Sequence, residues 1–119
     1  MRIAIAGAGK VGRAIARDLI NRGHDILVID KETNRTDDDI APGVELMIAD
    51  ACEVSTLERA DLARCDVMVA ATGDDKVNLV VSLLAKTEFG VRRVVARVNH
   101  PRNEWMFDES WGVDTAVST

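Results

Sequence analysis

A glycine-rich turn near the N-terminus, Gly7-Ala8-Gly9-Lys10-Val11-Gly12, limits most strongly what this 119-residue chain can fold into. An apolar run, residues 3–6, comes directly before it, and a segment with helical spacing of apolar residues follows it as far as residue 22. The spacing G-x-G-x-x-G between a strand and a helix is typical of a dinucleotide-binding βαβ unit. The sequence therefore predicts that the chain opens with such a unit.

Each glycine of this turn has a predicted role. Gly7 permits the tight turn, Gly9 lets a diphosphate approach the backbone, and Gly12 allows the helix to pack closely on the strand. Unpaired amides at the start of the helix and the helix dipole favour a bound anion. We therefore predict that the diphosphate lies against the turn, with contributions from Ala8, Lys10 and Val11. Lys10 adds a cation, unless it is an ordinary surface lysine.

The rest of the chain alternates short apolar runs with helical segments, which indicates a parallel sheet with right-handed crossovers. Hydrophobic residues make up 47% of the chain but aromatic residues only 3%, which favours an aliphatic sheet buried on both faces. We predict one α/β domain, residues 1–119, with a Rossmann-like, doubly wound, six-stranded parallel sheet of order 3-2-1-4-5-6 and helices on both faces. The expected strands are 3–6, 26–29, 44–49, 67–71, 93–98 and 113–117, and the expected helices are 10–22, 55–62 (capped by Ser55), 74–88 and 101–111, with a short helix and loop in 31–39.

Further candidate site residues stand where the predicted strands end, the edge of such sheets that binds ligands. Asp30 ends the second strand, where a carboxylate accepts hydrogen bonds from an adenosine ribose and repels a 2′-phosphate; its alternative role is helix capping. Lys31 contacts the ribose or only water. Asp50 and Ala51 follow the third strand and frame the adenine, or form an ordinary turn.

The fourth and fifth strands end across the predicted switch point from the glycine-rich turn. Ala71, Thr72 and Gly73 end the fourth strand, and Lys76 lies in the helix that follows. Arg97 ends the fifth strand and is able to reach a phosphate or an acidic partner. We expect these residues near the second half of the ligand.

Composition argues against several other functions. A formal net charge of −5 disfavours nucleic acid and direct contact with an anionic membrane. No apolar run approaches the ~20 residues that span a bilayer, so we expect an intracellular protein without membrane insertion. The acidic run 37–39 lacks a calcium-binding ligand array, and no metal site is expected. His24 and His100 are poor catalytic candidates, and the chain has no tyrosine, so catalysis is not expected.

Trp105, Met106, Phe107 and Trp111 form a local cluster that is unusual in a chain so poor in aromatic residues. We interpret part of this cluster as an interface between protomers or with a following domain. The alternative is a helix that faces the core.

Taken together, these residues resemble the regulator-of-potassium-conductance N-terminal (RCK, or KTN) domains, including those of TrkA-like subunits of bacterial potassium uptake systems. The resemblance covers almost the whole chain. Its most specific part is Ala71-Thr72-Gly73-Asp74-Asp75-Lys76-Val77-Asn78, and it extends through Val28-Ile29-Asp30-Lys31, Ala49-Asp50-Ala51, Val95-Ala96-Arg97-Val98-Asn99-His100-Pro101 and Trp111-Gly112-Val113-Asp114.

The resemblance implies a cytoplasmic regulatory subunit or domain that binds NAD(H) or ADP/ATP and gates a membrane potassium uptake system. It also implies a homodimer or higher homo-oligomer that contacts the membrane only through its transporter partner. Members usually carry a further ligand-binding domain after this one, so the chain is either one domain of a longer protein that continues beyond Thr119 or works with a separate partner. The alternatives are the cofactor-binding half of an NAD-dependent oxidoreductase and an interaction protein with a vacant nucleotide fold.

Overall fold

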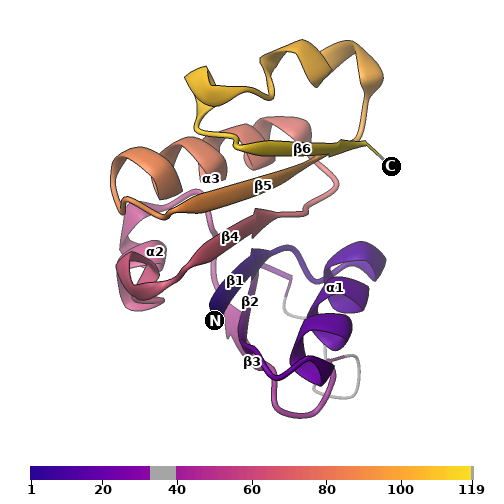
Figure 1. Ribbon diagram of the computed structural model, residues 1–119, viewed down its shortest axis with the longest axis vertical. Coiled ribbons are helices and arrows are strands. Elements are labelled where there is room, and N and C mark those ends of the chain that lie inside the picture. The colour runs from indigo at the N-terminus through magenta and orange to yellow at the C-terminus, as the bar shows by residue number, and fades with distance from the viewer. Residues whose placement is uncertain (33–39, 119) are drawn as a thin grey trace.

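A parallel six-stranded sheet of order β3-β2-β1-β4-β5-β6 runs through the molecule (Figure 1). This computed structural model describes residues 1–32 and 40–118. The predicted fold class and strand order are confirmed. The strands are β1 (Arg2–Ala6), β2 (Asp25–Asp30), β3 (Glu45–Ile48), β4 (Val67–Ala70), β5 (Arg93–Val98) and β6 (Thr115–Ser118). The α-helices are α1 (Lys10–Asn21), α2 (Val54–Arg59) and α3 (Asp75–Thr87), and 3₁₀ turns form η2 (Leu62–Arg64), η3 (Pro101–Met106) and η4 (Glu109–Trp111).

Alternation of side chains along the buried strands divides the core between the two faces of the sheet. In β1, Ile3 and Ile5 pack on the face that α1 covers, whereas Ala4 and Ala6 pack on the opposite face. Figure 1 shows α1 on one side of the sheet and α2 and α3 on the other. Both faces are therefore covered by helices, as predicted, and the carboxyl ends of the central strands remain as the edge where a ligand can enter.

The helix predicted over residues 101–111 is wrong, because the segment forms the two 3₁₀ turns η3 and η4. Phe107 ends the first turn with non-helical backbone angles and buries its ring in the core, with 6% of its surface exposed. Asp108 then starts a new turn, since its carboxylate accepts a hydrogen bond from the amide of Ser110. Burial of Phe107 and capping by Asp108 break the predicted helix.

The second helix also differs from its prediction. Glu53, rather than Ser55, occupies the N-cap of α2, and no side chain caps that helix. Asp61 adopts a left-handed backbone with φ 55°, which ends the helical segment before Leu62 begins the separate turn η2. The predicted short helix within 31–39 and the acidic run 37–39 fall at positions 33–39, outside the described residues.

The aromatic cluster divides between the core and the surface. Phe107 is buried, Met106 and Trp111 are partly buried against the same core, and Trp105 is 76% exposed. Only Trp105 therefore offers a large exposed surface to a partner. Among the described residues, no helix has the length and apolar character to cross a membrane.

Candidate functional site

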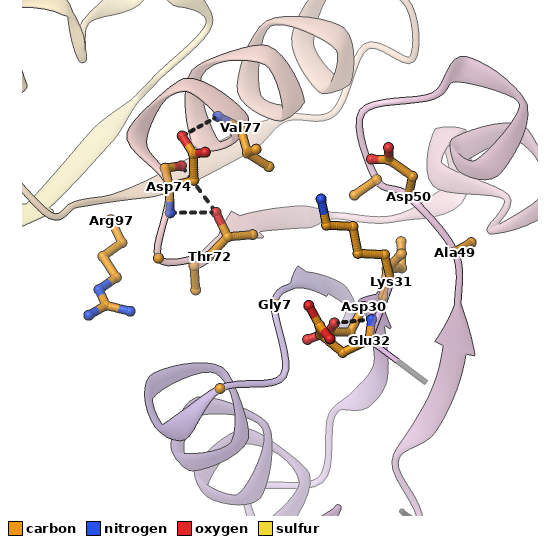
Figure 2. Close-up of a pocket in the computed structure, with 15 residues that line it drawn as sticks. Gly7, Asp30, Lys31, Glu32, Ala49, Asp50, Thr72, Asp74, Val77 and Arg97 are labelled. Atoms are coloured by element: carbon orange, nitrogen blue, oxygen red, sulfur yellow. Dashed lines mark hydrogen bonds between the residues drawn. The ribbon is translucent and has the colours of Figure 1, made fainter. Parts of the chain in front are cut away.

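A pocket of about 430 Å³ lies at the carboxyl ends of β1 to β5, in the volume range of small-molecule sites (Figure 2). Neighbouring parallel strands end there at one edge, so residues distant in sequence meet. Ten residues predicted for the site line this pocket: Gly7, Gly9, Asp30, Lys31, Asp50, Ala51, Ala71, Thr72, Gly73 and Arg97. The predicted residues Ala8, Lys10, Val11, Gly12 and Lys76 are not among its lining residues.

Gly9 leaves the start of α1 open to the pocket. A Cβ atom built on Gly9 meets no heavy atom within 4 Å, whereas one built on Gly12 would lie 1.9 Å from the Gly7 carbonyl oxygen. Gly12 is thus required for the packing of the fold, whereas Gly9 leaves open space beside the start of the helix. Because Gly9 is also the N-cap and no side chain caps α1, the first-turn amides of the helix are available to an anion.

Two other amides of the glycine-rich turn are already used within the protein. The Gly7 amide donates to the Ile29 carbonyl oxygen at 2.8 Å, and the Ala8 amide donates to Asp30 Oδ2 at 2.6 Å. Ala8 is fully buried. Ala8 therefore holds the Asp30 carboxylate. The position open to an anion, called the diphosphate seat below, begins at Gly9 and does not extend over the whole turn.

Asp30 is fixed at the edge of the pocket by two main-chain donors. Besides the bond from Ala8, its Oδ1 accepts a hydrogen bond from the Glu32 amide at 2.7 Å. An ionised carboxylate has about four acceptor positions, so each oxygen keeps a lone pair for a sugar hydroxyl. Figure 2 shows Asp30 beside the Gly7 turn and Lys31 extending from the end of β2 into the pocket.

The opposite side of the pocket is built on a buried amide that the sequence analysis did not single out. Asn78, in α3, is fully buried, and its side chain bonds both the main chain and the hydroxyl of Thr72. It also donates to the Arg97 carbonyl oxygen at 3.0 Å. Asn78 thus holds the ends of β4 and β5 together. The sequence pointed to Asn78 only as the last residue of the segment that carries the most specific part of the resemblance.

Asp75 extends this network beneath the pocket. Its buried carboxylate accepts hydrogen bonds from the main-chain and side-chain amides of Asn99, the His100 amide and the Asn103 side chain. Burial by itself would raise the pKa of Asp75, but donation from Asn103, Asn99 and His100 outweighs burial and leaves the pKa below its ordinary value. Asp75 is therefore ionised and ties the start of α3 to the turn that enters η3.

The side chain of Asp74 faces the helix rather than the pocket. It caps α3 by accepting from the amides of Lys76 and Val77, and Figure 2 shows the bond to Val77. The pocket residues that sequence reasoning missed are Ile29, Glu32, Ala49, Asp74 and Val77. Most of them adjoin a predicted residue at the end of a strand, so neighbourhood along the chain was the available signal.

No group of three or more potential metal-ligating side chains occurs in residues 1–32 and 40–118. Cys52 follows the turn at Asp50, and its amide donates to Asp50 Oδ1. Burial, followed by the negative charge of Asp50, raises the pKa of the Cys52 thiol. Cys52 therefore has none of the thiolate character of a reactive cysteine.

Comparison with known proteins places this architecture in a family. Residues 3–119 match the model of the TrkA-N domain. The chain is 58% identical over 119 residues to the Trk system potassium uptake protein TrkA of Mycobacterium tuberculosis, covering all of this chain and 54% of that protein. It is 34% identical over 119 residues to a TrkA homolog of Methanothermobacter thermautotrophicus, covering 99% of this chain and 54% of that protein.

Solved structures agree with these relatives. The structure described as GsuK bound to ADP superposes with a TM-score of 0.84 at 27% identity, over 98% of this chain and 30% of that one. This chain spans about half the length of the curated relatives, 54% for the two compared above. The match over nearly every residue and the shared fold confirm the resemblance found in the sequence: the chain belongs to the TrkA-N domain family.

Proposed function

We propose that this domain binds an adenine nucleotide through its diphosphate and uses the bound nucleotide to regulate a membrane potassium uptake system. The observation that carries the proposal is the open seat at Gly9, where an uncapped helix start meets a pocket bordered by the fixed carboxylate of Asp30. Helix amides favour the phosphates, and a carboxylate at the end of the second strand suits the ribose hydroxyls.

NAD(H) and ADP/ATP both supply the adenosine and diphosphate that this side of the pocket suits. A related protein was solved with ADP, which supports a ligand of this class. All five further residues line the pocket, and in the proposed complex Asp50 and Ala51 border the adenine while Thr72, Gly73 and Arg97 border the far end of the ligand. The carboxylate of Asp30 disfavours a 2′-phosphate, so NADP is not the proposed ligand.

The proposed partner is the membrane subunit of a potassium transporter, because the relatives bear the name of potassium uptake proteins. The domain would then work in the cytoplasm as a homodimer or higher homo-oligomer, and it would reach the membrane only through that subunit. We propose regulation rather than catalysis, because the relatives that match this chain are named as potassium uptake proteins. His24 lies at the opposite end of the sheet, beside the N-terminal amine.

Gly9→Val tests the diphosphate seat. Because a Cβ on Gly9 meets no atom of the protein, the variant is expected to unfold at the parent temperature and to lose measurable binding of NADH, NAD, ADP and ATP in calorimetry. Parent-like binding of all four ligands by the folded variant would overturn the placement of the diphosphate.

Asp30→Ala tests the ribose contact in the same titrations. We expect every nucleotide to bind more weakly by about 1–3 kcal/mol, the usual cost of losing hydrogen bonds to a charged group. Asp18→Ala is the matched control, since Asp18 lies on the exposed face of α1 and pairs with Arg22. Equal affinities of the Asp30 and Asp18 variants would exclude Asp30 from the site.

A further inference from the structure

The amide of Asn78 has one possible orientation. Its Oδ1 accepts from the Thr72 amide at 3.0 Å and contacts Thr72 Oγ1 at 2.6 Å. Its Nδ2 donates to the carbonyl oxygens of Thr72 and Arg97, both at 3.0 Å. Reversing the amide would set its NH₂ against the Thr72 N–H and its oxygen against two carbonyl oxygens. The main chain therefore determines which atom of Asn78 faces the Thr72 hydroxyl.

That orientation also determines where the hydroxyl proton of Thr72 points. Asn78 Oδ1 carries no proton, so a separation of 2.6 Å between two oxygens is favourable only if Thr72 donates. The carbonyl of Asp74, at 3.1 Å, is the weaker alternative acceptor, and it too belongs to the protein. The Asp74 amide donates to the same hydroxyl oxygen at 3.3 Å. A threonine hydroxyl has one donor and two acceptor positions, so a single lone pair remains for a ligand.

The charges that line the pocket favour the same kind of ligand group. Even without Asp74, whose carboxylate caps α3, the lining residues carry more carboxylates than cationic side chains: Asp30, Glu32 and Asp50 against Lys31 and Arg97. Further phosphates beyond the diphosphate increase repulsion in such a pocket. A neutral group that donates a hydrogen bond meets no such repulsion.

Given the proposed nucleotide site, we infer that Thr72 is a specificity-determining residue that accepts a hydrogen bond from a donor group beyond the diphosphate, a sugar hydroxyl or a carboxamide, and does not bind a phosphate there. The site thereby favours a dinucleotide over a nucleoside triphosphate. Asn78 supports this selection because it takes up the proton that Thr72 would otherwise offer to a phosphate oxygen.

Thr72→Val removes the lone pair and keeps the shape of the side chain. We expect its affinity for NAD to fall roughly tenfold, the upper end for one neutral hydrogen bond, while ADP and ATP bind as tightly as to the parent or more tightly. Thr72→Ser retains the hydroxyl and is expected to restore parent affinity for NAD. A loss for both ADP-ribose and NAD identifies the ribose hydroxyl as the donor, and a loss for NAD alone identifies the carboxamide.

Thr56→Val is the matched control, because it is the same exchange at a buried threonine that does not line the pocket. The inference fails if Thr72→Val weakens ATP as much as NAD, or if it changes neither. A parent protein that binds none of the nucleotides would instead defeat the proposed function itself.

A measurement on the parent alone covers the case in which Thr72→Val does not fold. NAD, ADP-ribose and ADP-ribose analogues that each lack one hydroxyl of the second ribose are titrated into unmodified protein. We expect one analogue to bind about tenfold more weakly than ADP-ribose, or NAD to bind that much more tightly than ADP-ribose. Equal affinity for NAD, ADP-ribose and every analogue would overturn the inference.

Discussion

Replacing Asp75 by asparagine keeps the shape of the buried side chain but removes its charge and one of its two acceptor oxygens. The variant therefore measures how much the hydrogen-bonded carboxylate contributes to stability. Asp75 Oδ1 accepts from the Asn99 amide at 2.7 Å and from Asn99 Nδ2 at 3.1 Å, and Oδ2 accepts from the His100 amide at 3.0 Å and from Asn103 Nδ2 at 2.8 Å. In Asp75→Asn one of these oxygens becomes an NH₂ group. Asn103 is able to rotate its amide in response, but a main-chain N–H of Asn99 or His100 has no such freedom.

At least one of these main-chain N–H groups therefore loses its acceptor, at a cost of about 1–3 kcal/mol. The bonds that survive also lose their charge assistance, which makes a hydrogen bond roughly twice as strong. Together we expect Asp75→Asn to lower the free energy of unfolding by about 2–4 kcal/mol. That is a large part of the ~5–15 kcal/mol that a domain of this kind possesses.

Urea unfolding at neutral pH, followed by far-ultraviolet circular dichroism, measures this loss. Asp114→Asn is the comparison, because the Asp114 carboxylate also bonds a main-chain amide, that of Val94, but pairs with Lys86 at a side chain that is 41% exposed. Water screens such a pair, so we expect about 1 kcal/mol or less there. A loss below ~1 kcal/mol for Asp75→Asn would refute the argument from an orphaned amide.

The lowered pKa of Asp75 gives the same prediction a pH dependence. A carboxylate whose pKa is lower in the folded protein contributes stability that is complete above its unfolded pKa, about 3.9, and that is lost as the pH falls through its folded value. The difference between parent and Asp75→Asn is therefore expected to be constant near neutrality and to shrink in acid below pH ~4. A difference that stays constant into strong acid would contradict this sign.

Three further substitutions test other parts of the structure. Thr56→Val is expected to raise the free energy of unfolding by about 1 kcal/mol, because the Thr56 hydroxyl is buried without a hydrogen-bond partner among the described residues; a lowered melting temperature would contradict this. Gly12→Ala is expected to unfold the domain or to cost ~3 kcal/mol or more, since its Cβ would lie 1.9 Å from the Gly7 carbonyl oxygen; circular dichroism would show a parent-like melt if the clash were absent. Trp105→Ala is expected to weaken self-association in sedimentation equilibrium without changing the fold, because its side chain is 76% exposed; unchanged association would remove Trp105 from the proposed interface.

Local signals were sufficient to predict the fold. Apolar runs of strand length alternate with helical spacing, and the glycine-rich turn places the first βα unit, so topology rules leave few arrangements. The end of each strand then indicated most of the pocket. Asp30, Asp50 and Arg97 were predicted as site residues because parallel strands end at a common edge, and all three line the pocket.

The missed features depend on contacts between distant residues. Asn78 bonds the Arg97 carbonyl 19 positions away, and Asp75 bonds Asn103 28 positions away, so no local pattern reveals either role. The segment 101–111 was predicted as one helix, but the ring of Phe107 is buried against the sheet and the chain bends to place it there. Tertiary packing decided that segment against its local pattern.

The two sides of the pocket are fixed separately, and this limits how a nucleotide could act as a switch. Asp30 is held by the amides of Ala8 and Glu32, and Thr72 is held by Asn78 and Asn99. A ligand shifts a conformational equilibrium only through contacts that differ between the two states. The affinity of a nucleotide that contacts only the Asp30 side therefore does not depend on the spacing between the two sides. The affinity of a nucleotide that also bonds Thr72 does depend on it. In a regulator built on this domain, the ligands that switch it must differ in what they place beside Thr72.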